Sequence, residues 1–487
     1  MNIAMFTSEL APVAKAGGLG DAVAGLAKAL VARGHTVDVL VPLYDCSRLA
    51  FIKDLTICYE RLYVPEFDRW TPEIVYQGTV EGLTCFFFPC GDRFRRKEIY
   101  AYDDDIFRFA HFCRAGMEFL LKTGRRPDIL HANDWSTALA PILLYEMYAG
   151  QGFEKTRAAF TIHNIEHQGQ TWSGEFLFPS VGLDAMRMFS WDRLLDDHRA
   201  FAVNLMKGAI VYSNAVNTVS PTYAREIMTP DGGKGLDGIL RQYHTKVRGI
   251  INGIDFETWN PATDPLIPVN YSADTFDRKF ANKRILREKL GIKDDYRPIV
   301  ACITRLVHQK GLDLIKHAIF HTLRIGGQFA LLGTSPMESI NQEFRDIGAG
   351  LYHDPHSYIG VTYNEELAHL MYAGADIIIV PSIFEPCGLT QIIGLRYGTV
   401  PLVRRTGGLA DTVFDHDFDP RPHHERNGFV FDTIDAPGIE HALNRAVGCW
   451  FNGSQHFNAL AANGMRTDNS WERSAAEYEA MYNAIKA

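Results

Sequence analysis

The chain has 487 residues, too many for a single hydrophobic core, so two or three domains are expected. Its 49 basic and 58 acidic residues give a formal net charge of −9, which argues against a general nucleic-acid-binding protein. No run approaches the ~20 apolar residues that span a bilayer, and the eight cysteines lack C-x-x-C spacing, which favours a reducing compartment, the cytoplasm or a plastid stroma.

The chain opens with an apolar strand at residues 2–6, a glycine loop at 15–21 and a helix at 22–30. A Gly-Gly turn between a strand and a helix exposes backbone N–H groups that bind anions. Lys15, just before Gly17 and Gly18, indicates that the anion is a phosphate. The loop fits neither G-x-G-x-x-G nor the P-loop pattern, but a second Gly-Gly loop recurs at 406–411.

Strand-like runs alternate with helical patterns through the first half of the chain. The pattern predicts strands at 37–41, 129–131, 159–163, 210–218 and 247–251, a helix at 106–122 and an antiparallel insertion at about 55–89. Such alternation indicates a parallel sheet with helices on both of its faces.

A second series of strands and helices begins at residue 299. It predicts strands at 299–303, 329–332, 358–361, 377–380, 400–403 and 428–431, and a helix at 312–323. The expected fold class is therefore α/β, with two doubly wound Rossmann-like domains facing each other across a cleft. The predicted boundaries are a first domain at 1–250, a linker at 251–262, a second domain at 263–465, and a C-terminal helix at 466–487 that packs back on the first domain.

Two polar loops follow strands of the second domain. Arg305 and Lys310 come after the strand at 299–303 and are expected to converge on an anion, with Lys15 as a third cation from across the cleft. Each such contact with a departing phosphate is worth about 2.7–4 kcal/mol in the transition state. Glu385 follows the strand at 377–380 and is either a helix-entry charge or a ligand to sugar hydroxyls.

Polar and aromatic residues also end strands of the first domain. The segments 131–135 and 161–164 follow neighbouring strands, and Trp135 and Tyr100 offer faces for sugar rings, although aromatics at such positions more often pack. The D-x-D pattern at Asp103–Asp105 is interpreted as acidic residues at a helix start, and no His or Cys cluster suggests a metal site.

Taken together, these motifs resemble the bacterial glycogen synthases and plant starch synthases, family five of the retaining glycosyltransferases, which have the GT-B fold. The resemblance covers nearly the whole chain and is nearest to starch synthase classes three and four. The motifs that carry it lie at 15–21, 131–135, 161–169, 251–255, 303–313, 385–391 and 406–412.

The resemblance implies transfer of glucose from ADP-glucose to the non-reducing 4-OH of an α-1,4-glucan or maltooligosaccharide, with retention of configuration. It implies no metal and no cofactor, and no nucleic-acid or membrane partner. The residues expected to act in catalysis are His163, Glu385, Arg305, Lys310 and Asp134. The residues expected to bind substrate are Lys15, Gly17, Gly18, Asp21, Asn252, Tyr363, Cys387, Gly388, Leu389 and Thr390, with Tyr100 and Trp135 added as aromatic faces.

Three other functions compete with this interpretation. A different retaining GT-B enzyme, such as a sucrose or trehalose synthase, would use UDP-glucose or a small acceptor. An NAD-dependent oxidoreductase would also suit two Rossmann-like domains, but the G-x-G-x-x-G pattern is absent. A non-catalytic glucan-binding protein is disfavoured because Lys15, Arg305, Lys310 and Glu385 are all present.

Overall fold

The computed structural model describes residues 1–486, which form two compact units. Unit 1 comprises Met1–Gly253 and the segment that begins at Trp471, and unit 2 comprises Ile254–Ser470. Both are Rossmann-like α/β domains, so the predicted fold class is confirmed. The predicted linker at 251–262 is divided between them, because residues up to 253 group with unit 1 and those from 254 with unit 2.

Unit 1 is built on one large sheet. Its strands are β1 (Asn2–Phe6), β2 (Thr36–Pro42), β3 (Lys53–Glu66), β4 (Arg69–Val80), β5 (Leu83–Phe88), β6 (Ile129–Asn133), β7 (Arg157–Ile162), β10 (Ala215–Thr218) and β11 (Val247–Gly249). Their order is β11-β10-β7-β6-β1-β2-β5-β4-β3. All neighbours are parallel except that β4 runs antiparallel to β3 and β5, which accounts for the predicted insertion. A two-stranded sheet pairs β8 (Gln170–Thr171) with β9 (Val203–Asn204).

Helices surround the sheet of unit 1. They are α1 (Gly18–Ala32), α2 (Asp105–Lys122), α3 (Leu139–Leu143), α4 (Gly174–Ser180), α5 (Ala185–Met188), α6 (Leu205–Tyr212), α7 (Pro221–Glu226), α8 (Pro230–Gly233), α9 (Asp237–Gln242) and α18 (Trp471–Ile485). Across residues 1–486, no helix combines the length and the apolar character needed to cross a membrane.

One predicted strand is wrong. Residues 210–218 were expected to be extended, but the first of them complete helix α6, and only Ala215–Thr218 forms a strand. The Asn204 side chain caps this helix by accepting a hydrogen bond from the Lys207 N–H at 3.0 Å. The β-branched and aromatic residues at 210–212 favour a strand, but here they form the last turn of α6, and Ser213 and Asn214 separate that helix from the strand.

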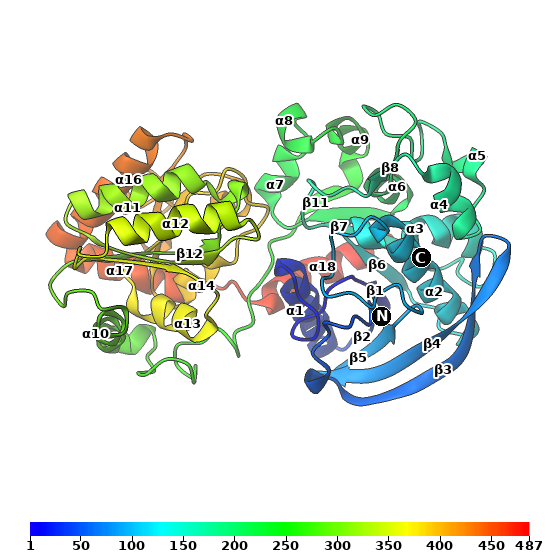
Figure 1. Cartoon of the computed structure of the whole chain (residues 1–487), viewed down its shortest axis with the longest axis horizontal. Coiled ribbons are helices and arrows are strands. Elements are labelled where there is room, and N and C mark those ends of the chain that lie inside the picture. The colour runs from blue at the N-terminus through cyan, green and yellow to red at the C-terminus, as the bar shows by residue number, and fades with distance from the viewer. Residues whose placement is uncertain (487) are drawn as a thin grey trace. The chain divides into compact units, whose positions relative to one another are not determined.

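Helix α18, drawn in red in Figure 1, packs beside α1 although the two are far apart in sequence. A chain of hydrogen bonds ties it to the sheet. The Tyr482 hydroxyl lies 2.9 Å from His131 Nδ1, and His131 Nε2 lies 2.7 Å from the Thr161 hydroxyl. Thr161 donates to Asn217, whose amide donates to the Tyr478 hydroxyl. The Thr161 hydroxyl has only one hydrogen, which it donates to Asn217, so it must accept a hydrogen bond from His131 Nε2. The other ring nitrogen, Nδ1, then accepts from the Tyr482 hydroxyl.

Unit 2 is a six-stranded parallel sheet in the order β14-β13-β12-β15-β16-β17. Its strands are β12 (Ile299–Arg305), β13 (Gln328–Thr334), β14 (Ser357–Val361), β15 (Ile377–Val380), β16 (Val400–Arg404) and β17 (Phe429–Phe431). Its helices are α10 (Lys279–Leu290), α11 (Leu312–Arg324), α12 (Glu338–Gly350), α13 (Glu365–Gly374), α14 (Thr390–Arg396), α15 (Gly407–Thr412), α16 (Ala436–Asn452) and α17 (Ser454–Arg466).

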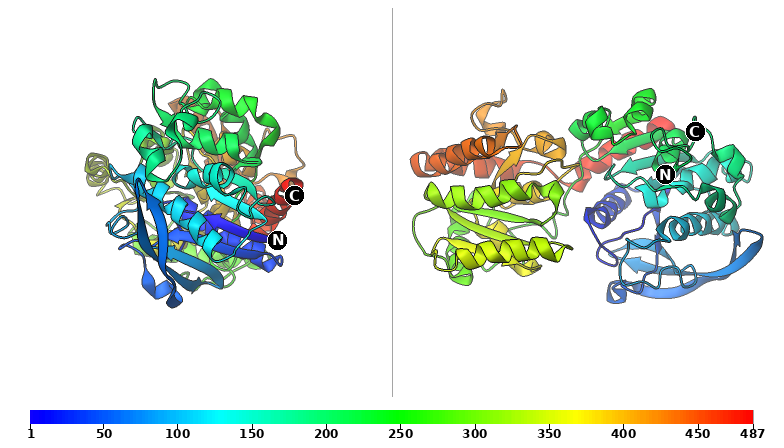
Figure 2. Two further views of the ribbon diagram at one scale, coloured as in Figure 1. Left: turned by 90° about the vertical axis from the view of Figure 1, so that its right-hand side faces the viewer. Right: turned by 45° about the horizontal axis from the view of Figure 1, so that its top comes forward.

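Figure 2 shows helices on both faces of this sheet. One apolar core joins α11, α12, α16 and α17 to the strands, and another joins α10 and α13 to them. Strand β15 reads Ile-Ile-Ile-Val and is buried throughout, as expected for a strand covered on both faces. The C-terminal helix, predicted over 466–487, begins at Trp471, because Arg466 still ends α17.

The hydrogen bond between Tyr482 and His131 generates a stability prediction. Replacing Tyr482 with Phe leaves a buried acceptor, His131 Nδ1, without a partner, which should cost about 1–3 kcal/mol of unfolding free energy. The measurement is urea unfolding followed by circular dichroism. Tyr63→Phe is the control, because Tyr63 is half exposed on β3 and its change should stay within about 0.5 kcal/mol. Equal losses in the two variants would contradict the assigned network.

Candidate active site

The polar residues of unit 2 gather where the strand order reverses. From β12 the chain moves outward through β13 and β14, and it then returns to the other side of β12 to form β15, β16 and β17. Arg305 ends β12, Lys310 follows it, and Glu385 follows β15. In open parallel sheets, ligands bind outside the carboxyl ends of the strands at such a switch point. The sequence-predicted cations and carboxylate therefore share the edge that favours a ligand.

Lys310 and Glu385 form an ion pair within this edge. Lys310 Nζ lies 2.5 Å from Glu385 Oε2, and the Ser382 hydroxyl donates to the same oxygen at 2.8 Å. Glu385 is only 5% exposed, so this pairing compensates for a charge withdrawn from water. Within residues 1–486, Glu385 Oε1 has no hydrogen bond. One oxygen of this fixed carboxylate can therefore accept a hydrogen bond from a hydroxyl group of a ligand.

The second glycine loop supports the turn that carries Glu385. The Gly408 N–H donates to the Glu385 carbonyl at 3.0 Å. A Cβ atom on Gly407 would lie 2.0 Å from that carbonyl oxygen, and one on Gly408 would lie 2.0 Å from the Cys387 oxygen. Both glycines are therefore required by close backbone approach.

The remaining predicted residues of unit 2 differ in exposure. Arg305 is exposed, and its guanidinium makes no hydrogen bond or ion pair with the residues that the structure describes. Tyr363 is 76% exposed, whereas Cys387 is buried. Gly388 and Leu389 precede α14, which begins at Thr390 without a side-chain cap. An unpaired cation and an open aromatic face are thus available at this edge.

The first glycine loop of unit 1 differs from the expectation. The N–H groups of Ala16 and Gly17 donate to Glu9 Oε2 at 2.7 and 2.9 Å. The Gly17 N–H group, which was expected to bind a phosphate, therefore already donates to a carboxylate of this chain. Lys15 pairs with Asp21 at 2.7 Å. Helix α1 also begins earlier than predicted, at Gly18. Sequence reasoning missed Glu9 because a single acidic residue after a strand gives no signal of its donors.

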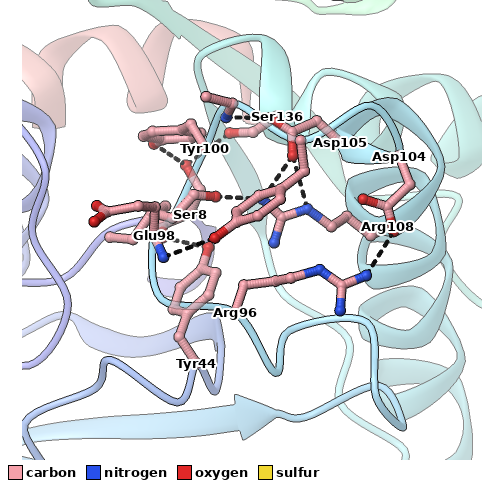
Figure 3. A network of polar contacts seen from close by, with 12 residues as sticks. Ser8, Tyr44, Arg96, Glu98, Tyr100, Asp104, Asp105, Arg108 and Ser136 are labelled. Carbon is pink, nitrogen blue, oxygen red and sulfur yellow. Dashed lines mark hydrogen bonds and ion pairs between the residues drawn. The ribbon is translucent and has the colours of Figure 1, made fainter. Parts of the chain in front are cut away.

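Tyr100 belongs to a buried network that reaches Glu9. Its hydroxyl donates to Glu9 Oε1 at 2.8 Å and lies 2.8 Å from Ser8 Oγ, which accepts from the Ser136 hydroxyl at 2.7 Å. Tyr44 donates to the Ser8 carbonyl at 2.8 Å (Figure 3). Since Ser8 follows β1 and Ser136 follows β6, the network lies at the point where the strand order of unit 1 reverses. The hydroxyl of Tyr100 is fixed by these contacts.

The D-x-D pattern holds the loop that carries Tyr100. Asp105 accepts from the Ala101 N–H at 2.9 Å and pairs with Arg108, and Asp104 pairs with Arg96 at 3.1 Å (Figure 3). Asp104 sits at the start of α2 without a side-chain cap. Asp104 and Asp105 therefore lie at the start of a helix, as expected. Their carboxylates pair with arginines, however, and do not cap the free N–H groups of that helix.

Asp134 and His163 are linked at the ends of β6 and β7. Asp134 Oδ1 accepts the backbone N–H groups of His163 and Asn164 at 2.7 and 3.3 Å, and Asp134 holds a φ of 58°. The His163 ring contacts Asn133 Oδ1 through Nε2 at 3.0 Å. Burial lowers the pKa of His163 to about 3 and raises the pKa of Asp134 to about 7. The imidazole is thus neutral at pH 7, and Asp134 holds a backbone conformation that is strained for a residue other than glycine.

The last two predicted residues of unit 1 have contrasting surroundings. Asn252 is buried, and its Oδ1 has no hydrogen bond with any residue that the structure describes. Trp135 meets the Phe109 ring edge-on at a centroid distance of 5.5 Å. Asn252 is therefore a candidate for a ligand contact, while Trp135 is largely committed to packing.

Two family models match the chain. Residues 2–242 match "Starch synthase catalytic domain", and residues 282–459 match "Glycosyl transferases group 1". "Glycogen synthase 1" of Nitrosococcus oceani is 48% identical over the full length of both chains, and "Glycogen synthase 2" of Methylococcus capsulatus is 49% identical over 99% of each. The solved catalytic domain of starch synthase IV from Arabidopsis thaliana, bound to ADP and acarbose, is 44% identical with a TM-score of 0.95 over 99% of each chain.

The two Rossmann-like units and both matching models define a glycosyltransferase. The full-length identities then place it more narrowly. The chain belongs to the family of glycogen and starch synthases.

The raised pKa of Asp134 predicts a dependence of stability on pH. The folded chain retains this proton to about pH 7, whereas the unfolded chain releases it near the ordinary value of 3.8. Between those values the folded state binds more protons, so stability falls as the pH rises. When the pH is raised from 5 to 8, the free energy of unfolding should therefore fall less in Asp134→Asn than in the parent chain. Urea unfolding at both pH values measures this difference, and identical losses would show that Asp134 titrates normally.

Proposed function

We propose that this chain transfers glucose from ADP-glucose to the non-reducing 4-OH of an α-1,4-glucan, with retention of configuration. The observation that carries the proposal is the Lys310–Glu385 pair at the switch point between β12 and β15, with the unpaired Arg305 at the end of β12. Relatives named glycogen synthase and a relative solved with ADP and acarbose support it.

In this proposal unit 2 binds the donor. Arg305 and Lys310 hold the diphosphate, because a cation at the leaving group offsets the charge that develops as it departs. The exposed ring of Tyr363 stacks on adenine. Glu385 accepts sugar hydroxyls through its unpaired Oε1, and the backbone amides from Cys387 to Thr390 contact sugar and phosphate.

Unit 1 binds the acceptor glucan in this proposal and contributes groups to the glucose. His163 binds the glucose as a neutral imidazole, consistent with its lowered pKa. Asp134 fixes the backbone of residues 163–164, and Asn252 offers its unpartnered amide oxygen to glucose or acceptor. Lys15 and the Gly18 amide complete the phosphate contacts. Because Glu9 already accepts from the Gly17 amide, that amide would serve the phosphate only if it exchanged its partner.

The proposed chemistry needs no protein nucleophile. The bond between the anomeric carbon and the diphosphate oxygen breaks, and the acceptor O4 forms the new bond on the same face of the sugar. The acceptor proton passes to the departing phosphate oxygen, so no external oxidant or reductant is required. Trapping of a covalent glucosyl–protein intermediate would contradict this front-face displacement. We propose that the transfer uses no metal or cofactor and takes place in the cytoplasm or a plastid stroma.

The function is tested by nucleotide release from ADP-glucose and from UDP-glucose, each with and without a maltooligosaccharide. Electrophoresis of labelled glucan measures product length. We expect chain extension with ADP-glucose, because a relative that is 44% identical over 99% of this chain was solved with ADP. Extension with UDP-glucose alone would change the donor, and extension with neither would overturn the assignment in favour of a small acceptor.

Lys310 provides a prediction about the leaving group. Lys310→Ala should lower kcat by ~10²–10³, because it removes a cation that acts on charge developing in the transition state. Lys316→Ala is the matched control, since Lys316 also pairs with a carboxylate, Glu343, at 2.7 Å but lies on α11 beyond the strand ends. The control should keep its kcat. A raised KM with unchanged kcat in Lys310→Ala would restrict Lys310 to ground-state binding.

A further inference from the structure

Helices α11 and α16 of unit 2 carry a cluster of metal-ligating side chains outside the strand-end site. His317 and His321 lie four residues apart on α11, and therefore on one face of it, and Glu440 lies in the first part of α16. One nitrogen from each histidine and one carboxylate oxygen all lie within 4.8 Å of one another. The proposed transfer reaction uses none of these residues.

The distances within the cluster suit a tetrahedral ion. His317 Nε2 lies 2.8 Å from Glu440 Oε1, and His321 Nδ1 lies 3.2 Å from the same oxygen. A zinc ion with ligand bonds of about 2.0–2.1 Å at tetrahedral angles holds its ligand atoms roughly 3.3 Å apart. Only small movements of side chains would bring the three atoms around one ion.

The tautomer of His321 strengthens this interpretation. His321 Nε2 lies 3.0 Å from Asn444 Oδ1, an acceptor, so the ring carries its proton on Nε2. Its other nitrogen, Nδ1, then presents a lone pair toward Glu440 Oε1 at 3.2 Å. Two acceptors at that separation repel unless a cation lies between them. The ring is 4% exposed, so water is largely excluded from satisfying it.

In the structure, that cation is the guanidinium of Arg324. One Arg324 nitrogen lies 2.8 Å from Glu440 Oε1 and 2.5 Å from His321 Nδ1. Arg324 ends α11, and its side chain is 65% exposed, so it can move into solvent without breaking the core. A divalent ion would replace one positive charge by two and would add His317 as a further ligand.

We propose that His317, His321 and Glu440 form a binding site for a zinc-class divalent ion that links α11 to α16. Two imidazole nitrogens and one carboxylate oxygen are ligands that zinc accepts, with a fourth position left for water. Asn444 would orient His321 as an outer-sphere partner, and Arg324 would compete with the ion. Sequence reasoning missed this site, because Glu440 is 123 residues from His317.

The test is zinc titration of the full-length, untagged chain after removal of metals with a chelator. Isothermal titration calorimetry measures affinity and stoichiometry, and thermal unfolding measures stabilisation. We expect one saturable site and a raised Tm, both lost in His317→Asn and in His321→Ala. Asn444→Leu should weaken binding by about 10–100-fold, the usual effect of losing an outer-sphere partner.

Two further variants separate a built site from incidental binding. Arg324→Ala should tighten zinc binding, because it removes the cation that competes for His321 and Glu440. His424→Asn is the matched control, since His424 is an exposed histidine of unit 2 beside Glu425 and should leave the affinity unchanged. Glucosyl transfer should persist in every one of these variants.

Absence of zinc binding in both the parent chain and Arg324→Ala would overturn the proposal. Binding that survives in His317→Asn and His321→Ala would also overturn it, because the ion would then occupy other residues. In either case the cluster would be an ion-pair network in which Arg324 is the permanent partner of Glu440. These outcomes are independent of the sugar donor and acceptor, so they leave the proposed function untouched.

Discussion

Withdrawing a carboxylate from water is costly unless an opposite charge and hydrogen bonds replace the lost hydration. In unit 2 this constraint acts on Glu385, which is almost fully buried between loops. Lys310 and Ser382 satisfy one of its oxygens, and the second glycine loop holds its backbone. The segments after β12, β15 and β16 are thereby fixed to one another. A ligand that meets the other oxygen meets a group whose position is already set.

Unit 1 meets a similar constraint with different groups. Glu9 is 3% exposed, and it is held by backbone N–H groups and by Tyr100 rather than by a cation. The donors come from the segment after β1 and from the segment before α2, which the Asp105–Arg108 pair holds in place. In both units, therefore, a buried carboxylate joins loops at the strand switch point. In unit 2, the glycine loop also provides the close backbone approach that the arrangement requires.

Much of the fold could be predicted because strand–helix alternation is a local property of the sequence. The runs at 299–303 and 377–380 are strands in the structure, and the second domain has the expected parallel order of an open sheet. Residues 210–218 were misassigned because the β-branched and aromatic residues at 210–212 favour a strand, although here they end a helix. The Asn204 cap was the local signal available for the helix.

The positions of the candidate-site residues could be predicted from the sequence, whereas most of their hydrogen-bond and ion-pair partners could not. Arg305, Lys310 and Glu385 were predicted to lie at one edge of the sheet because each is at or after the carboxyl end of a strand, and the carboxyl ends of parallel strands share one edge. No local pattern could show that Glu9 takes the Gly17 amide, or that Lys15 pairs with Asp21. Those contacts depend on burial and on the path of loops. The roles of the predicted residues in binding and catalysis stay predictions.

The position of α18 in unit 1 has a consequence for synthesis of the chain. His131 accepts its hydrogen bond from Tyr482, which is 351 residues later in the sequence. At about 5–20 residues per second, a ribosome needs roughly 20–70 s to make the intervening chain. During that interval, all of unit 2 is translated while the His131 pocket of unit 1 lacks its last helix. Completion of unit 1 is therefore coupled to translation of unit 2, although most of the sheet of unit 1 is encoded before unit 2.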